Sequence, residues 1–130
     1  LRQAAPTGRP LNFILVGSGL PAQEDLKQFS IGFLEQSCEV HLDLPNLLAV
    51  RDVMCTADLF FGCDSGLMHL AEALNKPGLV LFGHIRPEWR LLPGTRLRAC
   101  FSTQTVSDLS VDELLQAATK LMHDEGIYAV

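Results

Sequence analysis

The feature that most constrains the fold is the stretch from residue 57 to residue 83, which predicts a strand, a tight turn, a helix and a second strand in succession. Residues 57–62 form a short apolar run with two aromatics, which is typical of a strand buried on both faces. Asp64, Ser65 and Gly66 then interrupt the run with residue types favoured at helix N-caps and at close backbone approaches. A strand that feeds a helix in this way predicts an open parallel sheet with a functional edge.

The turn itself predicts an anion site. A helix that starts after a buried strand points free N–H groups and the positive end of its dipole out of the sheet edge, which suits a phosphate or diphosphate. His69 lies four residues after Ser65 on the same helical face, so its ring can reach the same ligand. The alternative is that the turn is only a helix cap and His69 only a partly exposed polar residue.

The string CDSGLMHLAEALNKPGLVLFG, residues 63–83, resembles the donor-binding signature of glycosyltransferase family 9, the heptosyltransferases of lipopolysaccharide core synthesis. The matching positions are Asp64, Ser65, Gly66, His69, Ala73, Leu74, Pro77, Phe82 and Gly83. The sequence departs from the family pattern immediately after Gly83. The family usually continues with Pro-Thr and a further Pro, whereas residues 84–87 read His-Ile-Arg-Pro.

The resemblance implies the C-terminal, donor-binding half of a GT-B glycosyltransferase, an enzyme that transfers a hexosyl or heptosyl group from a nucleotide-sugar without a metal or other cofactor. By that likeness Asp64, Ser65, Gly66, Leu67 and His69 bind the donor, with ADP-heptose as the family expectation. The acceptor, a glycan or lipopolysaccharide-type molecule, is expected on an N-terminal domain that 130 residues do not contain. We therefore expect this chain alone to be inactive and the catalytic base to lie elsewhere.

The remaining segments predict the rest of an α/β fold. Strands are expected at residues 12–16, 39–42, 78–82 and 97–101, and helices at 22–36, 47–55 and from Ser110 onward, where Ser110 and Glu113 form a capping box. This alternation is typical of a Rossmann-like parallel sheet with helices on both faces. Residues 1–10 are interpreted as a linker or remnant and residues 11–130 as one nucleotide-sugar-binding domain.

Two further groups of residues are candidates for ligand contacts. Gly17 and Ser18 follow the first predicted strand, and Leu44 and Pro45 follow the second, so all four are expected at the sheet edge beside the nucleotide base. The alternative for Gly17 and Ser18 is a simple strand-to-helix turn without a ligand.

The predicted loop 84–96 carries His84, Arg86 and Arg90, which are candidates for anion or acceptor contacts, since Arg suits phosphate. The alternative is a solvated rim. Trp89 in the same loop is either a cap on the edge of the core, the favoured interpretation, or a stacking surface.

Composition excludes several classes of protein. A net charge of −5 argues against a general nucleic-acid binder, and no apolar run is long enough to span a bilayer. The four cysteines have no C-x-x-C spacing, which disfavours a zinc site, and Cys38, Cys55 and Cys63 are interpreted as small core residues. Reduced thiols fit a cytoplasmic protein, with membrane-surface association open for the full-length enzyme.

Two other functions stay open from the sequence. One is a nucleotide- or sugar-binding module that kept this fold without catalysing transfer. The other is an unrelated α/β domain of flavodoxin-like or epimerase-like type, since fold does not fix function. No residue identifies the nucleotide base, the sugar or the oligomeric state.

Overall fold

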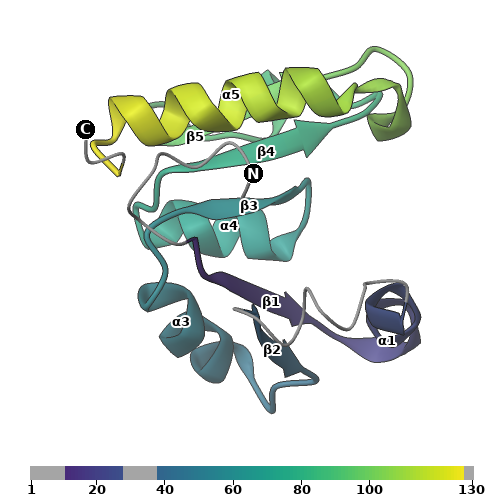
Figure 1. Ribbon diagram of the computed structural model, residues 1–130, viewed down its shortest axis with the longest axis vertical. Coiled ribbons are helices and arrows are strands. Elements are labelled where there is room, and N and C mark those ends of the chain that lie inside the picture. Colours follow the sequence, from purple (N-terminus) through teal and green to yellow (C-terminus); the bar gives the residue numbers. More distant parts are fainter. Residues whose placement is uncertain (1–10, 28–37, 128–130) are drawn as a thin grey trace. The chain divides into compact units, whose positions relative to one another are not determined.

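Figure 1 shows the computed structural model, which describes residues 11–27 and 38–127. The chain divides into two compact units, with the boundary between Thr56 and Ala57. We refer to the described residues before this boundary as the N-terminal unit and to those after it as the C-terminal unit.

The N-terminal unit consists of strand β1 (Phe13–Gly17), helix α1 (Gly19–Lys27), strand β2 (Cys38–Leu42) and helix α3 (Leu47–Cys55). The two strands pair in parallel, and Gly17 lies opposite Leu42 at their carboxyl ends. Helix α3 begins where predicted, because the side chain of Asn46 accepts a hydrogen bond of 2.9 Å from the Ala49 N–H.

Helix α1 starts earlier than the sequence predicted. Gly19 has a φ of +74°, a backbone conformation that glycine adopts without strain, and this lets the chain turn from β1 directly into the helix. The second half of the predicted helix, residues 28–36, lies outside the described residues.

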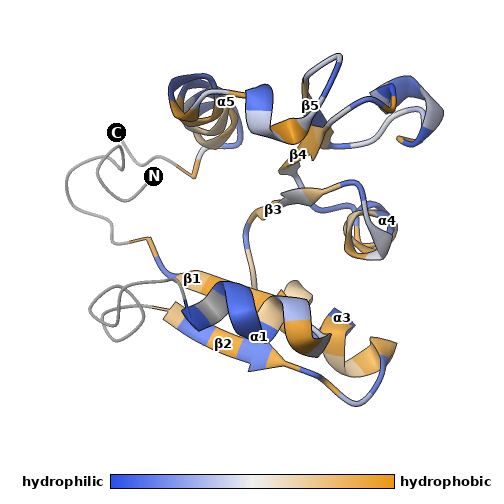
Figure 2. Cartoon of the chain, turned by 90° about the vertical axis from the view of Figure 1, so that its right-hand side faces the viewer, coloured by the Kyte–Doolittle hydropathy of each residue, from blue (hydrophilic) through white to orange (hydrophobic). Residues whose placement is uncertain are grey.

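The C-terminal unit contains a parallel sheet in the order β3-β4-β5, with bounds Phe60–Cys63, Gly78–Phe82 and Leu97–Phe101. Helix α4 (Gly66–Ala73) connects β3 to β4, and helix α5 (Val111–Asp124) follows β5. Short 3₁₀ turns lie at η2 (Pro87–Trp89) and η3 (Val106–Asp108). Figures 1 and 2 show α4 and α5 on opposite faces of this sheet.

The core of the C-terminal unit is built on β4, whose five residues are all buried. Leu79 packs against Ala118 and Leu121 of α5, whose apolar side is visible in Figure 2. Because side chains alternate along a strand, Val80 and Phe82 face the other side of the sheet, where α4 lies with Met68 fully buried. The predicted α/β class with parallel strands and helices on both faces is therefore confirmed, although the described strands pair in two sheets rather than one.

Several predictions of burial were wrong. Strand β3 spans residues 60–63 rather than 57–62, and its burial alternates, with the Phe61 side chain exposed. Cys55 and Cys63 are exposed rather than in the core, and Cys38 is half-buried. These residues occur in apolar runs, but an alternating strand and a single-sided helix turn some members of such a run toward solvent.

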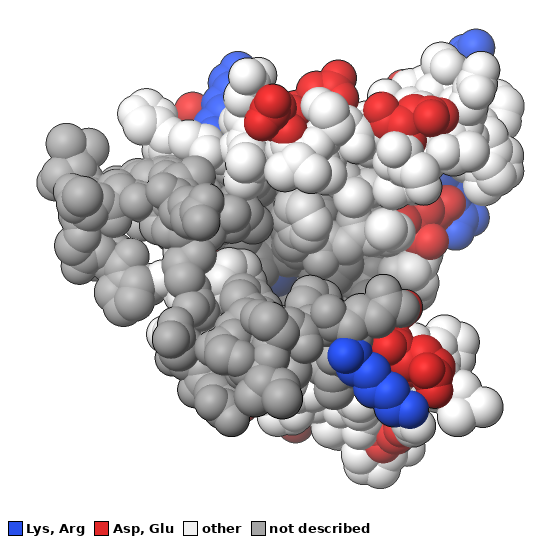
Figure 3. All heavy atoms as spheres, turned by 45° about the vertical axis from the view of Figure 1, so that its right-hand side comes forward, with Lys and Arg blue, Asp and Glu red and all other residues white. Residues whose placement is uncertain are grey.

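Within residues 11–27 and 38–127, no helix is long and apolar enough to cross a membrane. The charged side chains visible in Figure 3 lie in small groups, and in several of these groups acidic and basic residues lie close to one another.

Candidate functional site

The turn after β3 leads into a helix whose first amides have no side-chain cap. Ser65 occupies the N-cap position with extended φ and ψ, but its side chain makes no capping hydrogen bond. In α3 and α5 the corresponding side chains, Asn46 and Ser110, do accept such bonds. Within the described chain, the first N–H groups of α4 are therefore open to another acceptor, and the helix dipole favours an anion there.

Gly66 is the first residue of α4, and neither packing nor backbone strain explains why it is glycine. A Cβ built at this position would meet no heavy atom of the described residues within 4 Å. Its φ is not among the positive values found in this chain, so an L-residue fits the backbone. The space in front of Gly66 is open, which leaves room for a ligand to approach the backbone closely.

A second loop converges on this turn. Because β3 and β4 are parallel neighbours, the segments that follow them leave from the same edge of the sheet. Arg90, at the end of η2, donates from Nε to Oδ1 of Asp64 at 2.9 Å, and its Nη2 lies 3.3 Å from Nε2 of His69. The Asp64 side chain is only 19% exposed, whereas those of Arg90 and His69 are 42% and 45% exposed.

Glu72 lies behind His69 on α4 and is the most buried charged side chain of this group, at 3% exposure. Its Oε2 accepts a hydrogen bond of 2.9 Å from the Leu92 N–H. Its Oε1 lies 3.4 Å from Nδ1 of His69, and within the described residues this buried oxygen has no hydrogen bond that meets full geometric criteria. We call Asp64, His69, Glu72 and Arg90 the α4 charge cluster.

The other candidates of loop 84–96 differ from Arg90 in their contacts. His84 and Arg86 are exposed, and the Arg86 guanidinium lies 6.0 Å from the centroid of the Trp89 ring. Trp89 is 74% exposed, so its favoured interpretation as a cap on the core was wrong. Of the three residues predicted as ligand contacts in this loop, Arg90 is the one that reaches the turn at Asp64.

The four residues predicted to border a nucleotide base all belong to the N-terminal unit. The turns after β1 and β2 are joined by hydrogen bonds from Asp43 N to Gly17 O at 2.9 Å and from Gly19 N to Asp43 Oδ1 at 2.7 Å. These bonds place Gly17 and Ser18 on the same sheet edge as Leu44 and Pro45. Gly17 also has a packing role, since a Cβ there would lie 2.8 Å from Cβ of Ala22.

A family model matches most of the chain. The model of glycosyltransferase family 9 (heptosyltransferase) matches residues 26–113, which is more than half of the chain and includes the whole α4 charge cluster. The chain belongs to glycosyltransferase family 9. No curated protein and no solved structure matches the chain.

Membership of glycosyltransferase family 9 implies glycosyl transfer in general, with a sugar donor and an acceptor as partners. Sequence reasoning singled out Asp64, Ser65, Gly66, Leu67 and His69 at the first turn of α4, but it missed Glu72 and Asp43. Glu72 was detectable in principle, because it lies three residues after His69 on the same helical face. Asp43 carries no comparable signal in the local sequence, since only the pairing of β1 with β2 brings it to Gly19.

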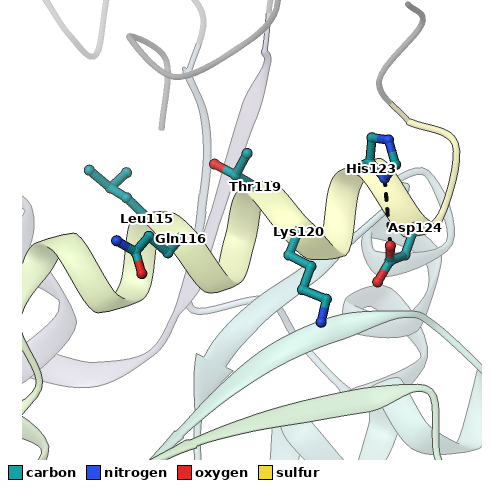
Figure 4. A pocket seen from close by; sticks show the side chains of 6 residues that line it. All are labelled: Leu115, Gln116, Thr119, Lys120, His123 and Asp124. Carbon is teal, nitrogen blue, oxygen red and sulfur yellow. Dashed lines mark ion pairs between the residues drawn. The ribbon is translucent and has the colours of Figure 1, made fainter.

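Two other features lie outside this site. Among the described residues, no group of three or more His, Cys, Asp or Glu side chains is placed to hold a metal ion. A surface pocket of about 530 Å³ is lined by six residues of α5 alone, as Figure 4 shows. This pocket has no residue in common with the α4 charge cluster.

Proposed function

We propose that the first turn of α4, with the α4 charge cluster beside it, forms the site for the diphosphate of a nucleotide-sugar donor. The observation that carries this proposal is the uncapped start of α4 with open space in front of Gly66. Free amides, a helix dipole and a guanidinium at one point suit a doubly charged diphosphate better than a neutral ligand.

This arrangement also suits the chemistry of glycosyl transfer. The bond from the sugar to the diphosphate breaks, and negative charge develops on the departing diphosphate oxygen. Backbone N–H groups and a cation fixed in advance at that oxygen stabilise the charge as it forms. Transfer without a metal requires such protein donors, and the α4 turn offers them.

For the rest of the donor we propose the arrangement expected from the sequence. Gly17, Ser18, Leu44 and Pro45 border the base. The donor is ADP-heptose, in keeping with the heptosyltransferase activity that the family description names. A lipopolysaccharide-type glycan is the corresponding acceptor.

We further propose that this chain by itself binds donor without turning it over. Transfer needs a base for the acceptor hydroxyl. The two carboxylates of the α4 charge cluster are both engaged, Asp64 by Arg90 and Glu72 by the Leu92 N–H. Detectable glycosyl transfer by this polypeptide alone would contradict this part of the proposal.

The test is an amide NMR titration of the ¹⁵N-labelled chain with ADP, UDP, GDP and inorganic phosphate, repeated with the Gly66→Ala variant. We expect one nucleoside diphosphate to shift the amides of Gly66, Leu67 and Met68, and the variant to bind about tenfold more weakly or worse, because the methyl group fills the approach to the backbone. Alanine is favoured over glycine in a helix by up to about 1 kcal/mol, so the variant should be as stable as the wild type or more stable.

Two results would contradict the proposal. One is unchanged affinity in the stable Gly66→Ala variant. The other is a set of shifts confined to residues distant from α4, which would place the ligand elsewhere.

A further inference from the structure

The hydrogen-bonding roles within the α4 charge cluster follow from what each group is able to donate. A guanidinium has only N–H donors and no acceptor. The contact of 3.3 Å between Arg90 Nη2 and His69 Nε2 is therefore a hydrogen bond only if Nε2 carries a lone pair. In a neutral ring the proton then lies on Nδ1, which faces Oε1 of Glu72 at 3.4 Å. A single tautomer of His69 thus presents an acceptor to Arg90 and a donor toward Glu72.

This tautomer changes the role of His69. Its Nε2 lone pair is engaged by Arg90, so in this arrangement the ring has no Nε2 proton to donate to a phosphate. His69 instead accepts a hydrogen bond from one N–H of the guanidinium, while Asp64 accepts one from another N–H at 2.9 Å. Within the described residues these contacts use two of the five N–H groups of Arg90 and leave three as donors.

Glu72 contacts both His69 and the loop segment that follows Arg90. One carboxylate oxygen faces His69, and the other binds the backbone of Leu92, two residues after Arg90. Because the Glu72 side chain is almost completely buried, its orientation is fixed by packing as well as by these contacts. A buried carboxylate on α4 therefore sets both the tautomer of the histidine and the position of the loop segment that carries the arginine.

We infer that Arg90 is the side chain that binds the diphosphate of the donor, and that His69 and Glu72 are positioning residues that aim it. The inference rests on the proposed function, since it names the side-chain ligand of the same site. A planar fork of N–H groups matches two phosphate oxygens at once, which the point charge of a lysine does not do. The competing arrangement is that the ion pair between Arg90 and Asp64 blocks the site, so that this ion pair must break before a ligand binds.

The first experiment compares the binding of inorganic pyrophosphate and ADP to the wild-type chain and to Arg90→Gln. The matched control is Arg98→Gln, because Arg98 also forms one ion pair, with Asp124, and is similarly exposed at 38%. We expect Arg90→Gln to lower the affinity for both ligands at least tenfold, and Arg98→Gln to leave it unchanged.

The second experiment uses Glu72→Gln, which keeps the size of the side chain. If its amide oxygen accepts the Leu92 N–H, its NH₂ faces His69 Nδ1 and requires the proton to move to Nε2, against Arg90. We expect the ring ¹⁵N shifts of His69, measured at about pH 8.5, to report Nδ1–H in the wild type and Nε2–H in the variant. Pyrophosphate affinity should fall with this change.

The outcomes separate the two proposals. If the wild type binds neither pyrophosphate nor any nucleoside diphosphate, both fail. If the wild type binds through the α4 amides but Arg90→Gln binds equally well or more tightly, the proposed function stands and the inference about Arg90 is overturned. An Nε2–H tautomer of His69 in the wild type would overturn the positioning role of Glu72.

Discussion

Asp43 illustrates how one side chain joins two elements that are far apart in the sequence. It lies at the carboxyl end of β2 with a φ of 54°, a left-handed conformation that Asp tolerates better than most residues. Its carboxylate accepts hydrogen bonds from the Gly19 N–H and from the side chain of Gln23. These bonds, the first of them foremost, lower the pKa of Asp43 below its ordinary value of 3.8.

The first prediction concerns the pH dependence of this contact. A carboxyl whose pKa is lower in the folded than in the unfolded chain stabilises the fold at pH values above its unfolded pKa. This stabilisation is lost as the pH falls through the folded pKa. We expect Asp43→Asn to have a lower free energy of unfolding than the wild type at pH 7, and the difference to shrink below about pH 4. Urea unfolding, followed by circular dichroism at about pH 7 and again below about pH 4, measures this difference in the free energy of unfolding.

The control for Asp43 is Asp25→Asn, which makes the same change of charge at an exposed position of α1. A pH-independent effect of Asp43→Asn, or an equal effect of Asp25→Asn, would contradict the role of these hydrogen bonds.

At the scale of elements, the helices of this chain differ in how they begin. Helix α5 begins with a complete capping box, in which Ser110 Oγ accepts from the Glu113 N–H at 3.1 Å and Glu113 Oε2 accepts from the Ser110 N–H at 2.8 Å. The bonds to Ser110 also lower the pKa of Glu113. The start of α5 is therefore secured within the chain, whereas the first amides of α4, at the candidate site, are left open.

The second prediction is that Ser110→Ala lowers the free energy of unfolding by about 1 kcal/mol, since the variant loses the hydrogen bond that Ser110 Oγ accepts from the Glu113 N–H. Ser107→Ala is the matched control, because Ser107 is an exposed serine of η3 and does not start a helix that packs on the sheet. Denaturant unfolding of both variants gives the comparison, and equal stability of the two would contradict the assigned role of the cap.

The third prediction concerns the packing of β4 between its neighbours. A Cβ added to Gly78 would lie 2.5 Å from the Phe60 carbonyl oxygen and 2.9 Å from a methyl group of Leu97. We expect Gly78→Ala to destabilise the chain by about 1–3 kcal/mol, because backbone in adjacent strands must shift to accept the methyl group. Gly66→Ala serves as the control in the same unfolding measurement, and a Gly78→Ala variant as stable as that control would contradict the packing argument.

At the scale of the whole chain, the charge is negative and much of the positive charge is already paired. The sequence has 10 Lys and Arg against 15 Asp and Glu. Among the described residues, the cations in ion pairs with carboxylates are Lys27, Arg51, Arg90, Arg96 and Arg98. Positive charge is therefore present as local pairs, and the face drawn in Figure 3 has no broad basic patch on its described part.

The fourth prediction is that the chain does not bind duplex DNA or RNA non-specifically, even at about 50 mM salt, since such binding requires several unpaired cations that release counterions from the phosphate backbone. Fluorescence anisotropy with a labelled duplex tests this. Micromolar binding that weakens steeply with added salt would contradict it.

The sequence by itself determined the features that depend on neighbours within a few residues. The strand-turn-helix-strand at the centre, the caps at Asn46 and Ser110, and the α/β alternation all follow from local periodicity and from hydrogen bonds between residues three or four apart. The family signature lies in the same continuous stretch, so it too was readable from sequence.

Only the tertiary structure decided which separate segments meet and which apolar side chains reach solvent. Arg90 meets Asp64 and His69 across more than twenty residues, because two loops leave adjacent parallel strands at one edge of the sheet. The exposure of Phe61 and Trp89 likewise depends on which faces the helices cover. Composition and spacing indicate that a side chain suits a core or a ligand. Which residues it contacts depends on how the helices and strands pack together. The local sequence does not encode that packing, because it joins segments that are far apart along the chain.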